Sequence, residues 1–147
     1  MADDRALLEL PHDESMRLLA SVPVGRLVFT HRALPAIRPV NHLVAGNTIV
    51  IGLTPGSAIA RATAALGTVV AYEADSLNVA DESGWSVIVV GVARPESDPA
   101  AARRYRLALR PWLAGATADI ICVSCEIVTG FRLAGPFAET EIARAAP

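Results

Sequence analysis

Apolar positions along this chain mostly follow the two-residue period of β-strands rather than the period of helices. Alternating or continuous apolar runs, bounded by Gly, Pro and polar turns, predict strands at residues 26–30, 36–44, 48–54, 68–75, 85–94 and within 119–133. The penultimate run is apolar at almost every position, which is typical of a strand in the centre of a sheet. The Gly46-Asn47 pair predicts a tight hairpin between the second and third strands.

Most of these strands are joined by connections too short for a parallel crossover, so an antiparallel sheet is expected. Six strands in this order favour a small barrel or closed sheet, which removes exposed edge strands. Three short flanking helices are predicted to begin near Pro11, Ser57 and Asp98 and to end before Pro23, at Gly67 and before Pro111. We therefore predict a mainly β single domain over residues 1–147, with 1–12 as a loose N-terminal arm and 135–147 as a C-terminal tail.

The composition fits one folded domain. With 147 residues, 52% of them hydrophobic, the chain can bury a core without help from disulfides or metals. A net charge of −2 argues against nucleic acid or an anionic membrane surface as a partner. No apolar run reaches the roughly 18 residues that span a bilayer, and the N-terminus is acidic where a secretion signal is basic. A cytoplasmic location is therefore expected.

All 13 basic residues are arginine, which limits the possible chemistry. Without lysine, Schiff-base catalysis and Walker-type phosphate binding are excluded, and any phosphate must be held by arginine, hydroxyl or backbone N–H groups. No G-x-G-x-x-G fingerprint or nucleophile elbow occurs, which argues against Rossmann and α/β-hydrolase functions. The arginines at 103–110 are interpreted as the solvated face of a helix rather than a nucleic-acid site.

The cysteines and histidines do not form a recognisable metal or redox site. Cys122 and Cys125 lie three apart in a predicted strand, so their side chains are expected on opposite faces. His12, His31 and His42 are widely separated and show no metal-ligand spacing. We expect two buried thiols and no metal.

The segment Arg38-Pro39-Val40-Asn41 is the more informative one. Pro39 stands inside a convincing strand but cannot donate to a sheet ladder, so the strand is predicted to be an edge there. Backbone groups beside Pro39, including those of Val40 and Asn41, would then be open to a ligand. Arg38 could present a planar fork of N–H groups to a phosphate. The alternative is an ordinary proline at a sheet edge beside a surface arginine.

A second polar group, Thr54 and Ser57, precedes the second helix. Hydroxyls at this position can bind an anion, and Arg61 one turn later could add positive charge. The alternative is an ordinary serine N-cap followed by a surface arginine.

At these residues the sequence resembles the pyridoxamine 5′-phosphate oxidase-related, FMN-binding split-barrel superfamily, in particular its branch of nitroimidazole-resistance reductases. The matching pieces extend over residues 13–133 and are SMRLLASVPVGRLVFT, LPAIRPVN, LTPGS, SGWSVIVVG, LRPW and IVTGFRL. The resemblance implies a six-stranded antiparallel split β-barrel with short helices. It also implies a homodimer with two FMN sites at the subunit interface.

By this resemblance, the Arg38–Asn41 strand would run beside the isoalloxazine ring, and Thr54 and Ser57 would hold the ribityl phosphate. Trp85 matches the family's G-W-S signature and is expected near the cofactor or across the dimer, or else as an anchor of the core or interface. The implied activity is two-electron redox chemistry on a small molecule, in which the flavin reacts and the protein supplies position. No residue is assigned as catalytic.

The sequence departs from the family where Ala58 and Ile59 follow Ser57, because family members usually place a basic residue there. Losing one charge-assisted bond to a phosphate would weaken binding roughly ten- to a hundredfold. FMN is the cofactor that the resemblance implies, and the missing basic residue leaves deazaflavin, FAD or no cofactor as alternatives. The corresponding alternative functions are a deazaflavin-dependent reductase and a non-catalytic dimeric ligand-binding protein.

Overall fold

The computed structural model describes residues 7–64, 67–109 and 119–134 of the chain. The strands are β1 (Leu7–Leu10), β2 (Val24–His31), β3 (Leu34–Ala45), β4 (Thr48–Leu53), β5 (Thr68–Asn78), β6 (Ser83–Pro95) and β7 (Asp119–Leu133). The helices are α1 (His12–Ala20), α2 (Ala58–Ala62) and α3 (Pro99–Ala108). The tail at 135–147 and the predicted helix end at Pro111 lie outside the described residues.

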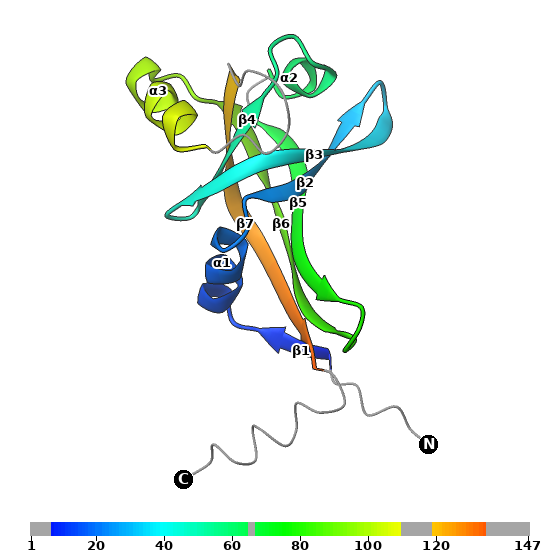
Figure 1. The fold of residues 1–147 in the computed structure, drawn as a ribbon. Coiled ribbons are helices and arrows are strands. Elements are labelled where there is room, and N and C mark those ends of the chain that lie inside the picture. Colours follow the sequence, from blue (N-terminus) through cyan, green and yellow to red (C-terminus); the bar gives the residue numbers. More distant parts are fainter. Residues whose placement is uncertain (1–6, 65–66, 110–118, 135–147) are drawn as a thin grey trace.

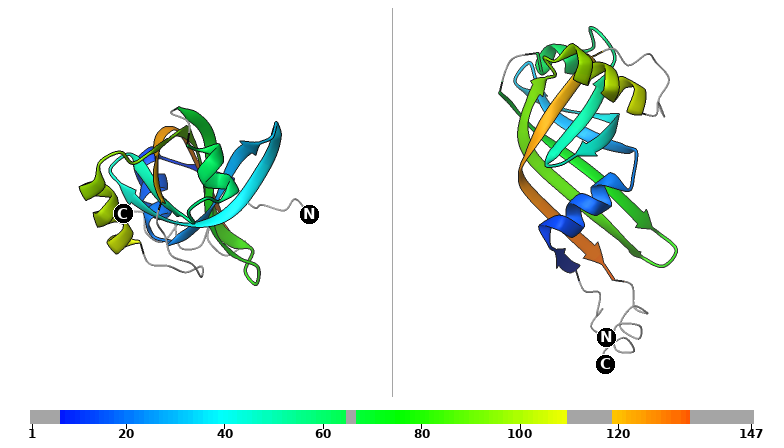
Figure 2. Two further views of the ribbon diagram at one scale, coloured as in Figure 1. Left: turned by 90° about the horizontal axis from the view of Figure 1, so that it is seen from above. Right: turned by 90° about the vertical axis from the view of Figure 1, so that its left-hand side faces the viewer.

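The strands form one antiparallel sheet in the order β1-β7-β4-β3-β2-β5-β6, and β6 also pairs with β7. This last pairing closes β2 to β7 into a ring of six strands, which is visible from above in Figure 2. The predicted mainly β fold, a six-stranded antiparallel split barrel with short flanking helices, is confirmed. As predicted, β6 has neighbours on both sides, and the helices flank the ring (Figure 1). Buried residues of α1 and α2 belong to the main core, whereas α3 covers a separate, smaller one.

Residues 7–10 differ from the expectation of a loose arm, because they form β1 and pair with Gly130–Leu133 of β7. The segment LLEL is too short to show a period, so its strand depends on the partner that the fold supplies. Its last residue, Leu10, packs against the main core.

The barrel is filled by the alternate residues of its strands. On β6, the inward side chains of Trp85, Val87 and Val89 are buried, whereas the intervening positions are more exposed. A second, smaller core lies outside the ring under α3 and contains Val50, Ala102, Leu109 and Ile120. The barrel interior therefore holds apolar side chains rather than a channel.

Cys122 and Cys125 lie on opposite faces of β7, as predicted. Cys125 belongs to the main core, whereas Cys122 packs against the smaller core under α3. Burial raises the pKa of Cys125 to about 11. Burial, with a contribution from Glu96, raises the pKa of Cys122 to about 12. Both thiols are therefore protonated at neutral pH and poorly reactive.

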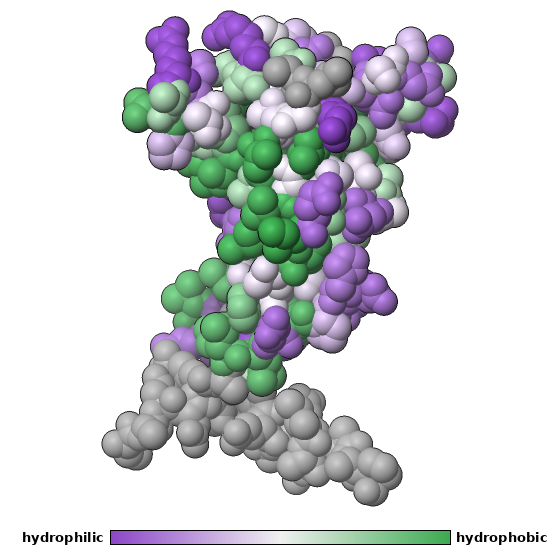
Figure 3. Space-filling view, turned by 180° about the vertical axis from the view of Figure 1, so that it is seen from behind, coloured by the Kyte–Doolittle hydropathy of each residue, from purple (hydrophilic) through white to green (hydrophobic). Residues whose placement is uncertain are grey.

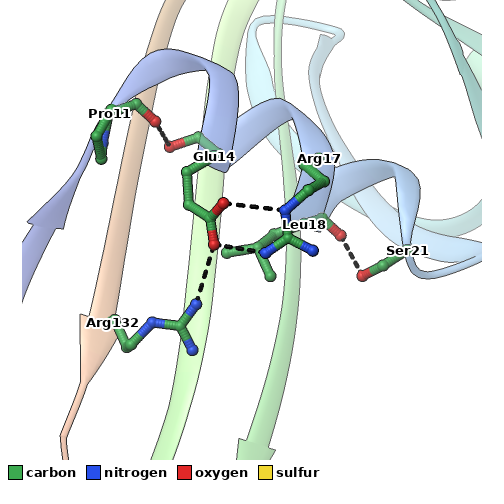
Figure 4. Close-up of polar contacts among 7 residues, drawn as sticks. Pro11, Glu14, Arg17, Leu18, Ser21 and Arg132 are labelled. Atoms are coloured by element: carbon green, nitrogen blue, oxygen red, sulfur yellow. Dashed lines mark hydrogen bonds and ion pairs between the residues drawn. The ribbon is translucent and has the colours of Figure 1, made fainter. Parts of the chain in front are cut away.

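Helix α1 is fixed to the barrel by polar contacts as well as by its buried face (Figure 4). The Glu14 carboxylate accepts a hydrogen bond of 2.9 Å from Arg17 Nε, within α1. It also accepts one of 3.3 Å from Arg132 Nη2, which belongs to β7. Hydrogen bonds from Arg17 lower the pKa of Glu14. These contacts are exposed, so they orient the helix more than they stabilise it.

Two element boundaries differ from the predictions. The expected loop at 76–84 is mostly strand, because β5 and β6 continue as a hairpin that extends away from the ring (Figure 1). Many residues of this hairpin are polar, so the sequence shows no alternation of apolar and polar positions that would predict a strand there. Helix α2 ends at Ala62, before the predicted stop at Gly67. At the residue after Ala62, the Thr63 hydroxyl donates a 2.8 Å hydrogen bond to the Ile59 carbonyl.

Candidate functional site

Strands β3 and β4 pair only over part of their length, and this opens a split in the barrel wall. Their ladder runs from Ala45 to His42 on β3 and stops there. Beyond it, residues 34–41 pair with β2 on one side and, within the described chain, with no strand on the other. Pro39 lies in this single-sided segment. The predicted strand edge at Pro39 is therefore confirmed.

A hollow of about 220 Å³ lies in this split. Its lining comes from β3, from β4, from the turn after β4 and from the start of α2, and comprises Arg38, Val40, Gly52, Leu53, Thr54, Ser57, Ala58 and Ile59. Four residues predicted from separate parts of the sequence meet here: Arg38, Val40, Thr54 and Ser57.

The turn that closes the hollow is built by Thr54-Pro55-Gly56-Ser57. The Ser57 N–H donates to the Thr54 carbonyl at 3.2 Å, and Gly56 takes a φ of +68°, which favours glycine. Ser57 caps α2 as predicted, because its Oγ accepts a 3.2 Å hydrogen bond from the Ala60 N–H. The hydroxyl proton of Ser57 is not used in this bond and can be donated to a ligand oxygen.

Arg38 gives the hollow its positive charge. Its side chain is exposed, and Nη1 donates to the Ile37 carbonyl at 2.7 Å. Among the described residues it makes no ion pair with a carboxylate. Arg61, in contrast, donates from Nη1 to the Gly56 carbonyl at 2.9 Å and does not line the hollow. Arg61 therefore braces the turn, whereas Arg38 is available to an anion.

Three other predicted residues do not line the hollow. Pro39 is exposed on the strand edge, and Asn41 is buried on the face of β3 opposite Val40. Trp85 is 8% exposed in the main core, at the start of β6. Helix α2 lies at the other end of β6, where Ala60 and Pro95 line one small cavity. A strand of this length separates the two ends by about 30 Å, so within one chain Trp85 acts as a core anchor.

A buried polar pair that the sequence analysis did not single out, His42 and Tyr72, lies where the β3–β4 ladder ends. The His42 ring contacts the Leu19 carbonyl of α1 through Nε2 at 2.8 Å, so Nε2 carries the proton. The other ring nitrogen, Nδ1, then accepts a hydrogen bond from the Tyr72 hydroxyl of β5. The two rings pack edge to face, with centroids 5.1 Å apart. One sequence signal could have revealed the buried histidine. His42 stands between the apolar inward positions Val40 and Val44 of the same strand.

Burial of this pair predicts a stability that depends on pH. Burial lowers the pKa of His42, so the unfolded chain, with a histidine pKa of about 6.5, binds a proton more readily. The contribution of the neutral His42 ring to the free energy of unfolding is therefore complete above about pH 6.5. It is lost as the pH falls toward the lower pKa that His42 has in the folded state. Over that range the free energy of unfolding should decrease by up to about 1.4 kcal/mol per pH unit.

Urea unfolding of the wild type and of His42→Gln between pH 8 and pH 5 measures this effect. The variant should show a shallower decrease, because it lacks the titrating ring while sharing every carboxylate. Equal slopes for the two proteins would contradict the assignment to His42.

The described residues form neither a metal site nor a membrane-spanning helix. No group of three or more histidine, cysteine or acidic side chains lies close enough to hold a metal ion among residues 7–64, 67–109 and 119–134. None of the helices in these ranges has the length and apolar character needed to cross a bilayer. The hollow instead brings together one arginine, Arg38, and the hydroxyl residues Thr54 and Ser57, a set of groups that suits an anionic ligand.

The chain is similar to known proteins in both sequence and fold. The family model for pyridoxamine 5′-phosphate oxidase matches residues 11–130. The uncharacterized protein Rv0080 of Mycobacterium tuberculosis is 49% identical over 132 residues, which cover 88% of this chain and 87% of that protein.

Two solved structures extend the likeness to the fold. The FAD binding protein from Mycobacterium smegmatis is 32% identical, with a TM-score of 0.67, and the match covers 86% of this chain and 98% of that one. A structure from Corynebacterium glutamicum is 25% identical, with a TM-score of 0.70, and the match covers 88% of this chain and 95% of that one. The matched residues include the split and every residue that lines the hollow. The chain belongs to the pyridoxamine 5′-phosphate oxidase family.

Proposed function

We propose that this protein binds a flavin nucleotide, with a phosphate group in the hollow and the flavin ring along the free edge of β3. The observation that carries the proposal is the position of Arg38, a guanidinium without an ion-pair partner in the described chain, on the wall of the hollow. The similarity to a Mycobacterium smegmatis protein that binds FAD supports the same class of ligand.

The polar groups of the hollow fit a phosphate and the polar edge of a ring. Arg38 and the hydroxyls of Thr54 and Ser57 can each donate hydrogen bonds to phosphate oxygens. The edge of β3 over residues 34–40, which has no strand partner on this side in the described chain, leaves backbone groups for the ring. When bound, the flavin would supply the two-electron chemistry, and the protein would position it and exclude water. No described residue is assigned a catalytic role.

The size of the hollow argues that a second copy of the chain completes the site. Pockets that enclose small molecules usually measure about 300–1,000 Å³. The hollow is smaller, at about 220 Å³, so a flavin held there would project beyond it. We therefore propose a homodimer, in which the partner covers the part of the cofactor that this chain leaves exposed.

An apolar surface on the outside of the barrel is available for that contact. Cross-strand neighbours Val28, Ala71, Val90 and Ile127 form one row over four strands, and we call this row and the flanking Val69 and Ile88 the outer face. Val69 and Ile127 are 65% and 60% exposed. Figure 3 shows apolar residues gathered in the middle of the molecule on the side opposite the view of Figure 1. An apolar patch of this kind marks an interaction site.

A specific observation favours FAD over the FMN expected from the sequence. The terminal phosphate of FMN is a monoester with a charge of about −1.5 to −2 at neutral pH. Each phosphate of the FAD diphosphate carries one charge, and Arg38 is the one cation lining the hollow among the described residues. Ala58 stands where a second cation would be placed. The Mycobacterium smegmatis structure, which binds FAD, is consistent with this preference.

The reaction we propose is a two-electron oxidation or reduction of a small molecule. The nitroimidazole-resistance branch and the cytoplasmic location stay predictions. A deazaflavin-dependent reductase and a non-catalytic dimeric binding protein are the alternatives that the experiment must separate.

The visible spectrum of the purified protein tests the proposal. A yellow protein that releases FAD or FMN, identified by chromatography, supports it, and the identity of the released nucleotide decides between the two. A colourless protein that cannot be reconstituted with either nucleotide would contradict it and favour the non-catalytic alternative. Tight binding of deazaflavin alone would favour the deazaflavin-dependent reductase.

A further inference from the structure

The buried His42 lies two residues along β3 from Val40, which lines the hollow. His42 and Ile51 form the last pair of the β3–β4 ladder before the strands separate. Val40, two residues earlier, lies on the same face of β3 and lines the hollow. His42 thus occupies the point at which the split begins.

Three other elements hold this point of β3. The backbone N–H of His42 donates to the Pro23 carbonyl at 3.0 Å, just before β2. Its ring is bonded to the end of α1 through Leu19 and to β5 through Tyr72. The Tyr72 hydroxyl reaches the ring over a glycine: a Cβ atom on Gly25 would lie 2.3 Å from that oxygen.

Gly25 connects this arrangement to the hollow, because it is the register partner of Val40. A Cβ atom at position 25 would also lie 2.6 Å from the Glu73 carbonyl oxygen, so this position admits no side chain while Tyr72 and β5 keep their places. Because these groups are closely packed, a shift of the Tyr72 hydroxyl or the His42 ring would therefore displace the β3 segment that lines the hollow.

We propose that His42, held by Tyr72, is a positioning residue that keeps β3 separated from β4, and that its protonation weakens ligand binding in the hollow. This inference rests on the proposed flavin site. The neutral ring donates through Nε2 and accepts through Nδ1. A protonated ring has two donors, so the bond from the Tyr72 hydroxyl must be given up or reversed in a place away from water.

Tyr72 is the titratable side chain that faces the ring from the packed elements. The charged and titratable side chains of α1, β2 and β5 otherwise lie toward solvent, and they are His12, Asp13, Glu14, Arg17, Arg26, His31, Glu73 and Asp75. Burial lowers the pKa of His42 and raises that of Tyr72, which agrees with a neutral pair at pH 7. Strand β4, across the split, carries no titratable side chain.

Flavin binding in three variants tests the positioning role. Tyr72→Phe removes only the hydroxyl, His42→Gln removes the titrating ring, and Val123→Ala is a control that truncates the core on β7. At pH 8, Tyr72→Phe should bind FAD and FMN about fivefold more weakly than the wild type, a loss typical of one hydrogen bond. Val123→Ala should keep wild-type affinity despite its lower stability. Equal affinities in Tyr72→Phe and Val123→Ala would overturn the positioning role.

The pH dependence tests the protonation step. Between pH 8 and pH 5 the wild type should lose more affinity than His42→Gln, while the titration of the ligand phosphate is common to both proteins. Equal pH profiles would overturn this step. Fluorescence quenching of the flavin measures each dissociation constant, and circular dichroism confirms that each variant is folded.

A measurement without ligand separates this inference from the proposed function. In the wild type, the backbone amide NMR signal of Ser57, across the hollow from β3, should shift with pH at the midpoint of the His42 ring signals. In His42→Gln this shift should be absent. If the wild type binds no flavin at pH 8, the proposed function fails, and this titration still decides whether His42 controls the hollow. A Ser57 amide that does not follow His42 would overturn the inference.

Discussion

Replacing Arg38 with methionine is expected to weaken flavin binding about ten- to a hundredfold, with little change in the stability of the fold. The guanidinium lines the hollow and forms no ion pair in the described chain, so its loss removes a charge-assisted bond to the ligand. Such a bond contributes about 1.5–3 kcal/mol. The aliphatic part of the side chain is retained by methionine. Titration of the apoprotein with FAD and with FMN, followed by fluorescence, gives the two dissociation constants.

Two further substitutions determine whether the effect belongs to the hollow. Arg61→Met is the matched control, because Arg61 lies on α2 but donates to the Gly56 carbonyl and does not line the hollow. Its effect on affinity should be small. Ala58→Lys adds a cation to the wall of the hollow and should tighten binding, more for FMN than for FAD. Equal losses in Arg38→Met and Arg61→Met, with no gain in Ala58→Lys, would place the phosphate elsewhere.

The candidate site could be predicted from the sequence because a hairpin connects its two sides. The Gly46-Asn47 turn sets the register in which Ala45 pairs with Thr48 and His42 with Ile51. Extending that register places residues 38–40 opposite residues 53–55, so the sequence already brings the proline-containing edge next to the turn after β4. This local constraint explains why Arg38, Val40, Thr54 and Ser57 meet as expected.

Features that depend on distant partners could not be predicted in the same way. The segment at 7–10 becomes a strand only because the end of β7 offers it a pairing edge. Trp85 matches a family signature, but its place in the core depends on how the barrel closes. For His42, the sequence shows only that a histidine stands at an inward-facing position of a predicted strand. The sequence contains no sign that Tyr72, thirty residues later, supplies its hydrogen-bond donor.

The second large effect concerns the proposed dimer. Ile127→Asp is expected to raise the dissociation constant of the dimer at least about a hundredfold and to abolish tight flavin binding with it. Ile127 is 60% exposed in the single chain and lies on the outer face opposite Val90, so an aspartate there is harmless to the isolated fold. In a dimer that covers this face, the carboxylate would be buried without a partner, which costs about 3–5 kcal/mol. Analytical ultracentrifugation measures the change.

An exposed leucine away from this face supplies the control for Ile127→Asp. Leu107 on α3 is 80% exposed, so Leu107→Asp introduces the same charge at an apolar surface position outside the outer face. It should leave both the dimer and flavin binding unchanged. If Ile127→Asp is monomeric and still binds flavin at wild-type affinity, the hollow is sufficient by itself, and the argument from its small volume is wrong. If both variants stay dimeric, the two copies meet through another surface, and the outer face must be assigned a different partner.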